Sequence, residues 1–279
     1  MAERPVARTF GLRGRVALIT GAGSGIGAAL AADLAGRGAR LALVDRDAGG
    51  LDAVAAALAA RGTDVSAHPL DVTDAAGLAA LPDAVLAHHG TLDCLVNNAG
   101  IALAGRVEDL SLEDVEAVMA VNFTAAMRLT HHCLPILAAR PAAQIVAVSS
   151  LYGLVAPAGQ SAYAASKFAL RGFFEALRHE YAGTGLGVTL VHPGGVATGI
   201  ARNARIGAWV DPAAVETGRA AFERHLRLDP AEAARQIARG IEARAPRLVV
   251  GKDARQVDRL QRLMPVRYWA ILARAIGDV

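Results

Sequence analysis

Short apolar runs alternate with alanine-rich segments along most of this chain. The runs have the length of β-strands, and the segments between them are long enough to form helices. This alternation predicts a parallel sheet that crossover helices cover on both faces. We expect seven strands, near residues 16–20, 41–45, 65–68, 94–97, 145–149, 188–192 and 248–251. We expect helices near residues 25–37, 48–61, 74–89, 112–139, 162–182 and 231–244.

The sequence predicts a single domain, because no linker, internal repeat or low-complexity block divides it. Its main unit covers residues 14–251, and residues 1–13 form an N-terminal arm. Residues 198–229 interrupt the alternation, and a long segment beyond the carboxyl ends of the strands is a candidate lid. Residues 252–279 form a helical tail with an apolar stripe. The stripe consists of Val257, Leu260, Leu263 and Met264.

Composition is that of an ordinary globular protein, with 53% hydrophobic and 20% charged residues in a chain of 279. The basic residues are scattered and interleaved with acidic ones, so we expect no nucleic-acid partner. Cys94 and Cys133 stand in no spacing suited to zinc, so we expect no metal site and no disulfide framework. Residues 1–15 lack the apolar core of a signal peptide, and no apolar run is long enough to span a membrane. These features favour a cytoplasmic location.

A glycine-rich turn, Thr-Gly-Ala-Gly-Ser-Gly-Ile-Gly, joins the first strand to the first helix at residues 20–27. Glycine permits a tight turn and lets backbone approach a pyrophosphate, while the helix N-terminus offers free N–H groups. Similar turns occur in methyltransferases and as packing devices, so the turn alone does not decide the ligand. A dinucleotide here implies a Rossmann-like, doubly wound α/β fold. The residues expected to contact it are Gly21, Ser24, Gly25, Ile26 and Gly27.

Asp45 ends the second strand, about eighteen residues after the turn, where a carboxylate can accept hydrogen bonds from the adenosine ribose hydroxyls. It would also repel the 2′-phosphate of NADP. Arg46 could instead pair with that phosphate or stack on the adenine. We therefore expect NAD as the cofactor, with NADP possible. Further contacts are expected from Asp71 and Val72 after the third strand, and from Asn98, Ala99 and Gly100 after the fourth.

Ser150, Tyr163 and Lys167 are the candidate catalytic residues. Ser150 ends the fifth strand, and Tyr163 and Lys167 lie one turn apart on one face of the following helix. A phenol has a pKa of about 10, which a neighbouring ammonium and an oxidised nicotinamide would lower. Such a phenol could exchange a proton with an alcohol. Lys167 and Lys252 are the only lysines in the chain, so this spacing does not come from a lysine-rich background.

These motifs together resemble those of the short-chain dehydrogenase/reductase family. The resemblance covers residues 14–251. It includes the glycine turn, NNAG at residues 97–100 and a lone asparagine, Asn122, in the central helix. It also includes Ser150, thirteen residues before YAASK at residues 163–167, and HPGG at residues 192–195, followed by Thr198. It implies that Tyr163 is the general acid/base, that Lys167 lowers its pKa and holds the nicotinamide ribose, and that Ser150 binds the substrate oxygen. Asn122 would support a water that leads a proton from the lysine to solvent. The nicotinamide carboxamide would be oriented by Pro193, Gly194, Val196 and Thr198.

The resemblance implies an NAD(P)-dependent oxidoreductase that interconverts a secondary alcohol and a ketone by hydride transfer. The alternative is a non-catalytic dinucleotide-binding regulator with the same fold, although such a module has no need of a tuned phenol. We expect a small hydrophobic substrate, because the candidate pocket residues are mostly apolar. They are Leu151, Leu154, Val155, Ala156, Pro157, Ile200, Trp209 and Phe222. Arg202 and Arg205 could meet an anionic substrate, but solvated lid charges are the commoner case.

Three expectations concern assembly and flexibility. The helices at 112–139 and 162–182 resemble those that pair subunits in this family, so a homodimer or homotetramer is expected. Gly195, the second glycine of HPGG, is expected to add freedom to the lid. Membrane-surface contact through the tail is a minor alternative, because basic residues accompany its apolar stripe although Pro265 interrupts it. The basic residues are Arg255, Arg259, Arg262 and Arg267.

Overall fold

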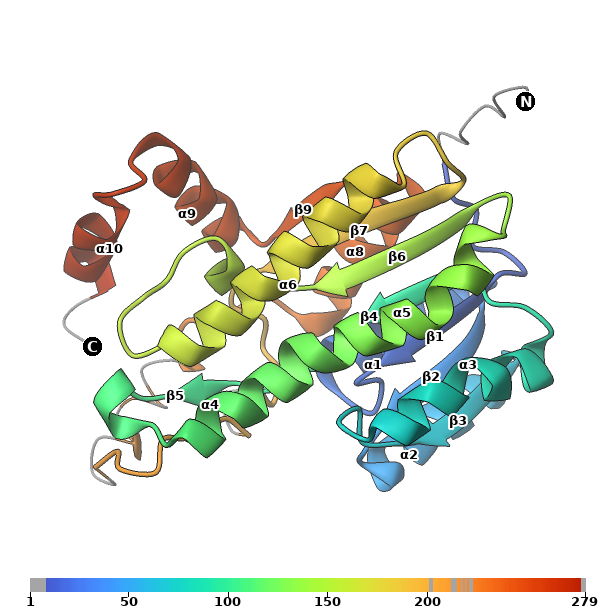
Figure 1. Ribbon diagram of the computed structural model, residues 1–279, viewed down its shortest axis with the longest axis horizontal. Helices are drawn as coiled ribbons and strands as arrows, with labels where there is room; N and C mark the ends of the chain where they lie inside the picture. Colours follow the sequence, from blue (N-terminus) through green and yellow to red (C-terminus); the bar gives the residue numbers. More distant parts are fainter. Residues whose placement is uncertain are drawn as a thin grey trace.

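A seven-stranded sheet forms the centre of the protein (Figure 1). The computed structural model describes residues 9–200, 203–211, 215, 216, 218, 220 and 223–276. The strand order is β3-β2-β1-β4-β6-β7-β9, and all neighbouring strands are parallel. The strands are β1 (Val16–Thr20), β2 (Arg40–Asp45), β3 (Val65–Pro69), β4 (Cys94–Asn97), β6 (Ala143–Val148), β7 (Leu186–Pro193) and β9 (Arg247–Val250). The predicted fold class and all seven strands are confirmed.

Helices cover both faces of this sheet. One apolar core lies under α1, α2 and α8, and a second lies under α3, α5 and α6. Leu18 of β1 belongs to the second core and Ile19 to the first, because successive strand residues face opposite sides. The helices are α1 (Gly25–Gly36), α2 (Ala48–Ala59), α3 (Ala75–His89), α5 (Ala125–Ala138), α6 (Ser161–Glu180) and α8 (Pro230–Glu242).

The strand order reverses its direction of growth between β1 and β4. Loops that leave the two strands therefore diverge toward opposite faces and open a crevice at the carboxyl edge of the sheet. Thr20 ends β1, Asn97 ends β4 and Val148 ends β6. The glycine turn (residues 20–27), the NNAG segment (residues 97–100) and Ser150, which follows β6, consequently meet at this edge.

The predicted single helix at 112–139 is interrupted. It consists of α4 (Leu112–Met119), a π-helical turn over Ala120–Thr124, and α5. The N–H of Ala125 bonds to the carbonyl of Ala120, five residues earlier. This wider turn holds Asn122 in the interior, where it is only 1% exposed.

Smaller elements extend beyond the carboxyl edge. β5 (Leu103–Ala104) pairs in parallel with β8 (Arg205–Ile206), so the predicted lid segment contributes a strand. The tail forms two helices, α9 (Lys252–Leu263) and α10 (Tyr268–Ile276), which lie at the same end of the molecule as α4 and β5 (Figure 1). No helix within the described residues is long and apolar enough to cross a membrane.

Candidate active site

The glycine turn after β1 exposes bare backbone at the start of α1. Gly21 has a φ of +66°, and a Cβ there would lie 2.9 Å from the Cα of Ala99. A Cβ on Gly27 would overlap the carbonyl oxygen of Gly21. Ser24, the N-cap residue, makes no side-chain capping hydrogen bond, so the first N–H groups of α1 stay open to an anion. These features fit the pyrophosphate of a dinucleotide.

Asn98 locks the NNAG segment onto this turn. Its Nδ2 donates to the carbonyls of Thr20 and Gly21, at 2.9 and 3.1 Å. In return, the Oγ1 of Thr20 accepts the backbone N–H groups of Asn98 and Ala99, both at 3.0 Å. Asn98 therefore holds the NNAG segment against the glycine turn within the candidate cofactor site. The sequence alone did not distinguish this structural role from direct contact with the cofactor.

Asp45 lies beside the glycine turn, as predicted. Its Oδ2 accepts the N–H of Gly23 at 2.8 Å, and its Oδ1 accepts the N–H of Asp47 at 3.0 Å. Each oxygen keeps a lone pair that could accept a ribose hydroxyl. Arg46 is exposed at the same strand end. Two hydrogen bonds from Thr73, backbone and side chain, and then the charge of Arg46, lower the pKa of Asp71.

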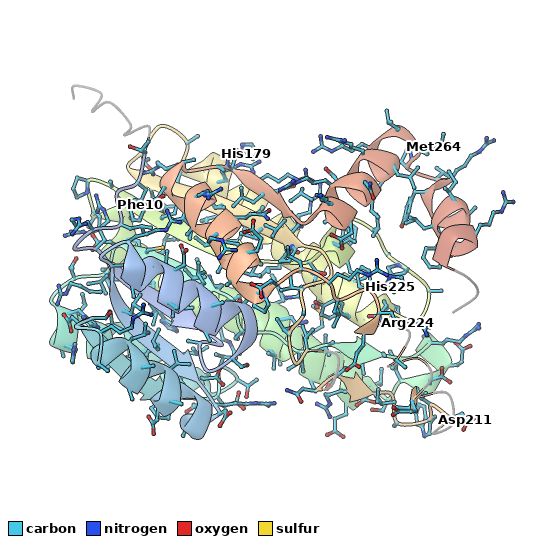
Figure 2. The ribbon with its side chains drawn as sticks, turned by 180° about the vertical axis from the view of Figure 1, so that it is seen from behind. Phe10, His179, Asp211, Arg224, His225 and Met264 are labelled. Atoms are coloured by element: carbon cyan, nitrogen blue, oxygen red, sulfur yellow. The ribbon has the colours of Figure 1, made fainter. Side chains whose placement is uncertain are left out.

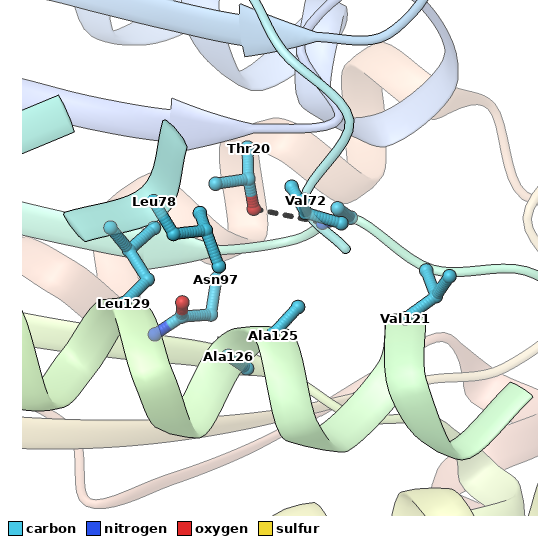
Figure 3. Close-up of a pocket in the computed structure, with 9 residues that line it drawn as sticks. Thr20, Val72, Leu78, Asn97, Val121, Ala125, Ala126 and Leu129 are labelled. Carbon is cyan, nitrogen blue, oxygen red and sulfur yellow. Dashed lines mark hydrogen bonds between the residues drawn. The ribbon is translucent and has the colours of Figure 1, made fainter. Parts of the chain in front are cut away.

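Val72 lines a small pocket beneath the NNAG segment (Figure 3). Thr20, Asn97 and Ala99 form its polar and backbone side. Apolar residues of α3, the π-helical turn and α5 complete it: Leu78, Val121, Ala125, Ala126 and Leu129. The structure thus places Val72 next to the predicted cofactor segments, although contact with adenine remains a prediction.

Tyr163, Lys167 and Ser150 come together at the carboxyl edge. Burial raises the pKa of Tyr163, and a hydrogen bond with Ser150 acts in the opposite direction. The Nζ of Lys167 lies 5.7 Å from the centroid of the Tyr163 ring. Burial is the larger of these two influences on the Tyr163 pKa, and the predicted lowering by Lys167 and an oxidised nicotinamide stays a prediction. Tyr152 packs edge-on against this ring, with centroids 6.0 Å apart.

Lys167 is 4% exposed, and its ammonium donates to the carbonyl of Val148 at 3.3 Å. Burial lowers its pKa to about 8. A Cβ on Gly100 would lie 3.2 Å from both Nζ and the Oδ1 of Asn122. Because Gly100 has no side chain, the backbone of the NNAG segment can lie close to the Lys167 ammonium.

Asn122 ties the central helix to the NNAG segment and α6. Its Oδ1 accepts the N–H of Ile101 at 2.8 Å, and its Nδ2 donates to the carbonyl of Ile101 and to the Oγ of Ser166. Ser166 in turn donates to the carbonyl of Tyr163 at 2.7 Å. Both donors of the amide are thus engaged within the protein, and the predicted water relay remains a prediction.

His192 is a positioning residue that the sequence did not predict. Its Nδ1 donates to the carbonyl of Ser150 at 3.1 Å, and the side chain is fully buried. Burial lowers its pKa to about 4. Its position in HPGG, at the end of a strand beside the serine strand, was the available signal. The neutral imidazole fixes the backbone of Ser150.

The HPGG segment is held by close packing, and the prediction for Gly195 was wrong. A Cβ on Gly195 would overlap the carbonyl oxygen of His225, and its N–H donates to Asp253 Oδ2 at 2.8 Å. Its φ is not in the left-handed region, so close approach and not flexibility requires glycine. Val196 bridges to Leu228. Pro193 ends β7, and a Cβ on Gly194 would overlap the Asp253 carboxylate. The side chain of Thr198 lies against the glycine turn, 3.2 Å from the position that a Cβ on Gly25 would take.

The predicted pocket residues occupy different environments. Leu154 and Val155 are 3% exposed, whereas Trp209 is 65% exposed and its N–H donates to the carbonyl of Asp109. The N–H of Ala156 donates to the hydroxyl of Tyr268 in the tail, at 3.0 Å. No sequence signal linked these two segments. Leu151, Pro157 and Ile200 are partly exposed.

Arg205 has an internal partner. Its NH2 lies 3.6 Å from the Oδ1 of Asp114, and Asp114 also caps α4 with Ser111. This pairing partly offsets the charge of Arg205, whose side chain is 43% exposed. Arg202 and Phe222 lie outside the described residues.

A charged cluster closes the opposite, amino edge of the sheet. Asp64, His88 and His89 lie close enough to hold a metal ion, which the cysteine and histidine spacing did not predict. Arg40, however, pairs with Asp64 at 2.7 Å and lowers the pKa of that carboxyl by its hydrogen bond. We interpret the cluster as an ion pair between Arg40 and Asp64, with His88 and His89 as further partners of the same carboxylate.

A doubly wound sheet with a glycine turn at its switch point and a Ser-Tyr-Lys group at its carboxyl edge defines a dinucleotide-dependent oxidoreductase. The short chain dehydrogenase family profile matches residues 15–208. The chain belongs to this family.

Similar proteins and structures support this assignment. The chain is 43% identical over 267 residues to the putative oxidoreductase SadH of Mycobacterium tuberculosis, covering 95% of this chain and 96% of that one. It is 40% identical over 198 residues to the D-threitol dehydrogenase of Mycolicibacterium smegmatis, covering 70% and 75%. A short-chain dehydrogenase/reductase from Burkholderia phymatum, solved with NAD, has a TM-score of 0.84 at 32% identity and covers 91% and 95%. One from Burkholderia cenocepacia, solved with NADP, has a TM-score of 0.75 at 33% identity and covers 88% and 100%.

Proposed function

We propose that this protein is an NAD-dependent dehydrogenase that interconverts a small hydrophobic secondary alcohol and its ketone. The observation that carries the proposal is the group formed by the buried Tyr163 and Lys167 and the partly exposed Ser150 at the carboxyl edge of the sheet. It lies at the same edge as a glycine turn whose backbone fits a pyrophosphate. A proton-exchanging phenol beside a dinucleotide site meets the needs of alcohol oxidation.

Each residue of this group has a distinct part in the reaction. A bound nicotinamide supplies the hydride acceptor or donor. Ser150 holds the substrate oxygen by a hydrogen bond, and Tyr163 takes the hydroxyl proton as the alcohol is oxidised and returns it in reduction. Because burial raises the pKa of Tyr163, the Lys167 charge must offset the cost of forming a phenolate in this apolar site.

Cofactor preference rests on Asp45. Its carboxylate keeps acceptor capacity for the ribose hydroxyls and opposes a 2′-phosphate. Arg46 is the residue that would favour NADP, and its positive charge interacts favourably with the Asp71 carboxylate. One related structure was solved with NAD and another with NADP, so both cofactors are consistent with the family. The carboxylate of Asp45 favours NAD in this chain.

The hydrophobic substrate preference rests on residues of this chain. The loop between Ser150 and Tyr163 is mostly apolar, and Arg205 is paired with Asp114. One relative is named for a polar alcohol, D-threitol, so the relatives do not define this preference. A matched ketone and keto acid test it: we expect faster turnover of the ketone, and faster keto acid turnover that Arg205→Ala abolishes would reject it.

The decisive experiment follows nicotinamide absorbance with NAD⁺ or NADP⁺ and a panel of secondary alcohols. We expect turnover with NAD⁺ that Tyr163→Phe abolishes while cofactor binding persists. Tyr152→Phe is the matched control, since that ring packs against Tyr163 and has no assigned proton transfer. Tight cofactor binding by the native protein without turnover of any alcohol would support the alternative, a non-catalytic regulator.

We also propose a cytoplasmic homodimer or homotetramer assembled through α5 and α6. These long helices run side by side over one face of the sheet (Figure 1). Leu112 and Phe168, on the α4 and α6 surfaces, are exposed large apolar side chains. A monomer mass by light scattering would contradict this assembly.

A further inference from the structure

Exposed apolar side chains collect at the tip of the tail. Eight large hydrophobic side chains are exposed among the described residues, and four of these lie within residues 263–271. Leu263 is 81% exposed and Val266 is 90% exposed. They flank the break between α9 and α10, where Pro265 prevents continuation of the helix. Figure 2 shows Met264 at one end of the molecule, away from the sheet.

Positive charge accompanies these apolar residues. Residues 252–276 contain six cationic and two acidic side chains, and both carboxylates are engaged. Asp253 accepts the N–H of Gly195, and Asp258 pairs with Arg247 at 2.6 Å and with Arg262 at 3.4 Å. The exposed arginines of the tail are Arg255, Arg259, Arg262, Arg267 and Arg274.

We propose that the tip, residues 262–267, docks on the surface of an anionic phospholipid bilayer. Leu263, Met264 and Val266 would enter the headgroup region, while Arg262 and Arg267 contact lipid phosphates. The excess of positive charge in residues 252–276 favours an anionic lipid surface as the partner. Exposed apolar side chains alone would not distinguish a lipid surface from another protein. The proposal is independent of the substrate.

The tail is attached firmly enough to orient the docked protein. Asp253 holds the HPGG segment, Asp258 holds β9 through Arg247, and Tyr268 holds Ala156. α4 and β5 lie at the same end as the tail (Figure 1). Docking through the tip therefore turns the carboxyl edge of the sheet toward the bilayer.

Sedimentation of the full chain with vesicles tests the proposal. We expect binding to phosphatidylcholine vesicles that contain phosphatidylglycerol, loss of this binding in high salt, and no binding to pure phosphatidylcholine. The double variant R262Q/R267Q should bind roughly 25-fold more weakly, since each arginine near an anionic surface strengthens binding about fivefold. L263S/V266S should weaken binding at least about tenfold.

R13Q/R61Q is the matched control, because it removes two exposed arginines from the amino edge and should keep binding within a fewfold of the native protein. Thermal melts followed by circular dichroism establish that the variants fold. Absence of binding to anionic vesicles, or equal losses in the control and the tip variants, overturns the proposal. A larger assembly in light scattering that L263S/V266S dissociates, without vesicle binding, would assign the tip to a second copy and also overturn it.

Discussion

The hydroxyl of Tyr268 accepts a hydrogen bond of 3.0 Å from the backbone N–H of Ala156, 112 residues earlier in the chain. Ala156 belongs to the loop between the candidate catalytic residues Ser150 and Tyr163. The tail helix α10 therefore supports one wall of the candidate substrate site.

Tyr268→Phe should raise KM for the alcohol about threefold to fivefold with little change in kcat. The substitution removes one partly exposed hydrogen bond, which contributes about 1 kcal/mol. Its removal loosens the loop that contains Ala156 and leaves the reacting atoms in place. Steady-state kinetics with a fixed alcohol measure the effect. KM for NAD⁺ should not change, and Tyr181→Phe, at the far end of α6, serves as the control. An unchanged KM for the alcohol would show that the hydrogen bond does not position the loop.

Gly195→Ala should lower the free energy of unfolding by about 1–3 kcal/mol, because the new methyl group overlaps the carbonyl of His225. Gly36→Ala is the matched control: nothing lies within 4 Å of a Cβ there, and it should be neutral or stabilising by up to about 1 kcal/mol. Urea denaturation compares the two variants. Equal stabilities would restore the flexibility interpretation of Gly195.

His192 should make the fold acid-sensitive between pH 6.5 and about pH 4. Burial lowers its pKa from 6.5 to about 4, so in this window the unfolded chain binds more protons than the folded protein. Stability therefore falls as the pH is lowered, by about 3 kcal/mol from this group.

Denaturation curves at pH 7 and pH 4 measure this loss. His192→Gln keeps a hydrogen-bond donor without a titrating ring, so its loss between the two pH values should be smaller by about that amount. His131→Gln, at an exposed site, should lose as much as the native protein. Equal losses in both variants would show that His192 does not carry the acid sensitivity.

Cys94 and Cys133 should resist thiol reagents in the folded protein. Burial raises the pKa of both thiols to about 12, and the thiolate is the reactive form. A disulfide-exchange reagent at pH 8 should label neither thiol quickly in buffer and both in guanidinium. Rapid native labelling would mean that the cores around β4 and α5 open readily.

Much of this fold could be predicted from the sequence because buried parallel strands are short, apolar and separated by helices. Asp47, Asp74 and Asp229 mark helix starts through capping, which kept those boundaries close to the predicted ones. The glycine turn, Ser150, Tyr163 and Lys167 could be predicted to meet because fixed spacings place them at one sheet edge, and the structure brings the three side chains together there.

The remaining features depend on contacts that no local pattern records. The π-helical turn at Asn122 arises from hydrogen bonds to Ile101 and Ser166, while the helical period continues on either side. Gly195 was misread because its constraint comes from His225, thirty residues later. The Tyr163 pKa also depends on burial, which spacing to Lys167 does not reveal.

Asp253 and Tyr268 together make the tail a connection between two loops of the candidate active site. A fusion or affinity tag that follows α10 would be attached to this tail, whereas one on the amino side of Phe10 would leave from the opposite edge of the sheet, where the N–H of Phe10 donates to the carbonyl of Glu242. Fusions at the two ends are therefore not equivalent. Kinetic constants measured on an N-terminally tagged protein should describe the native enzyme more faithfully.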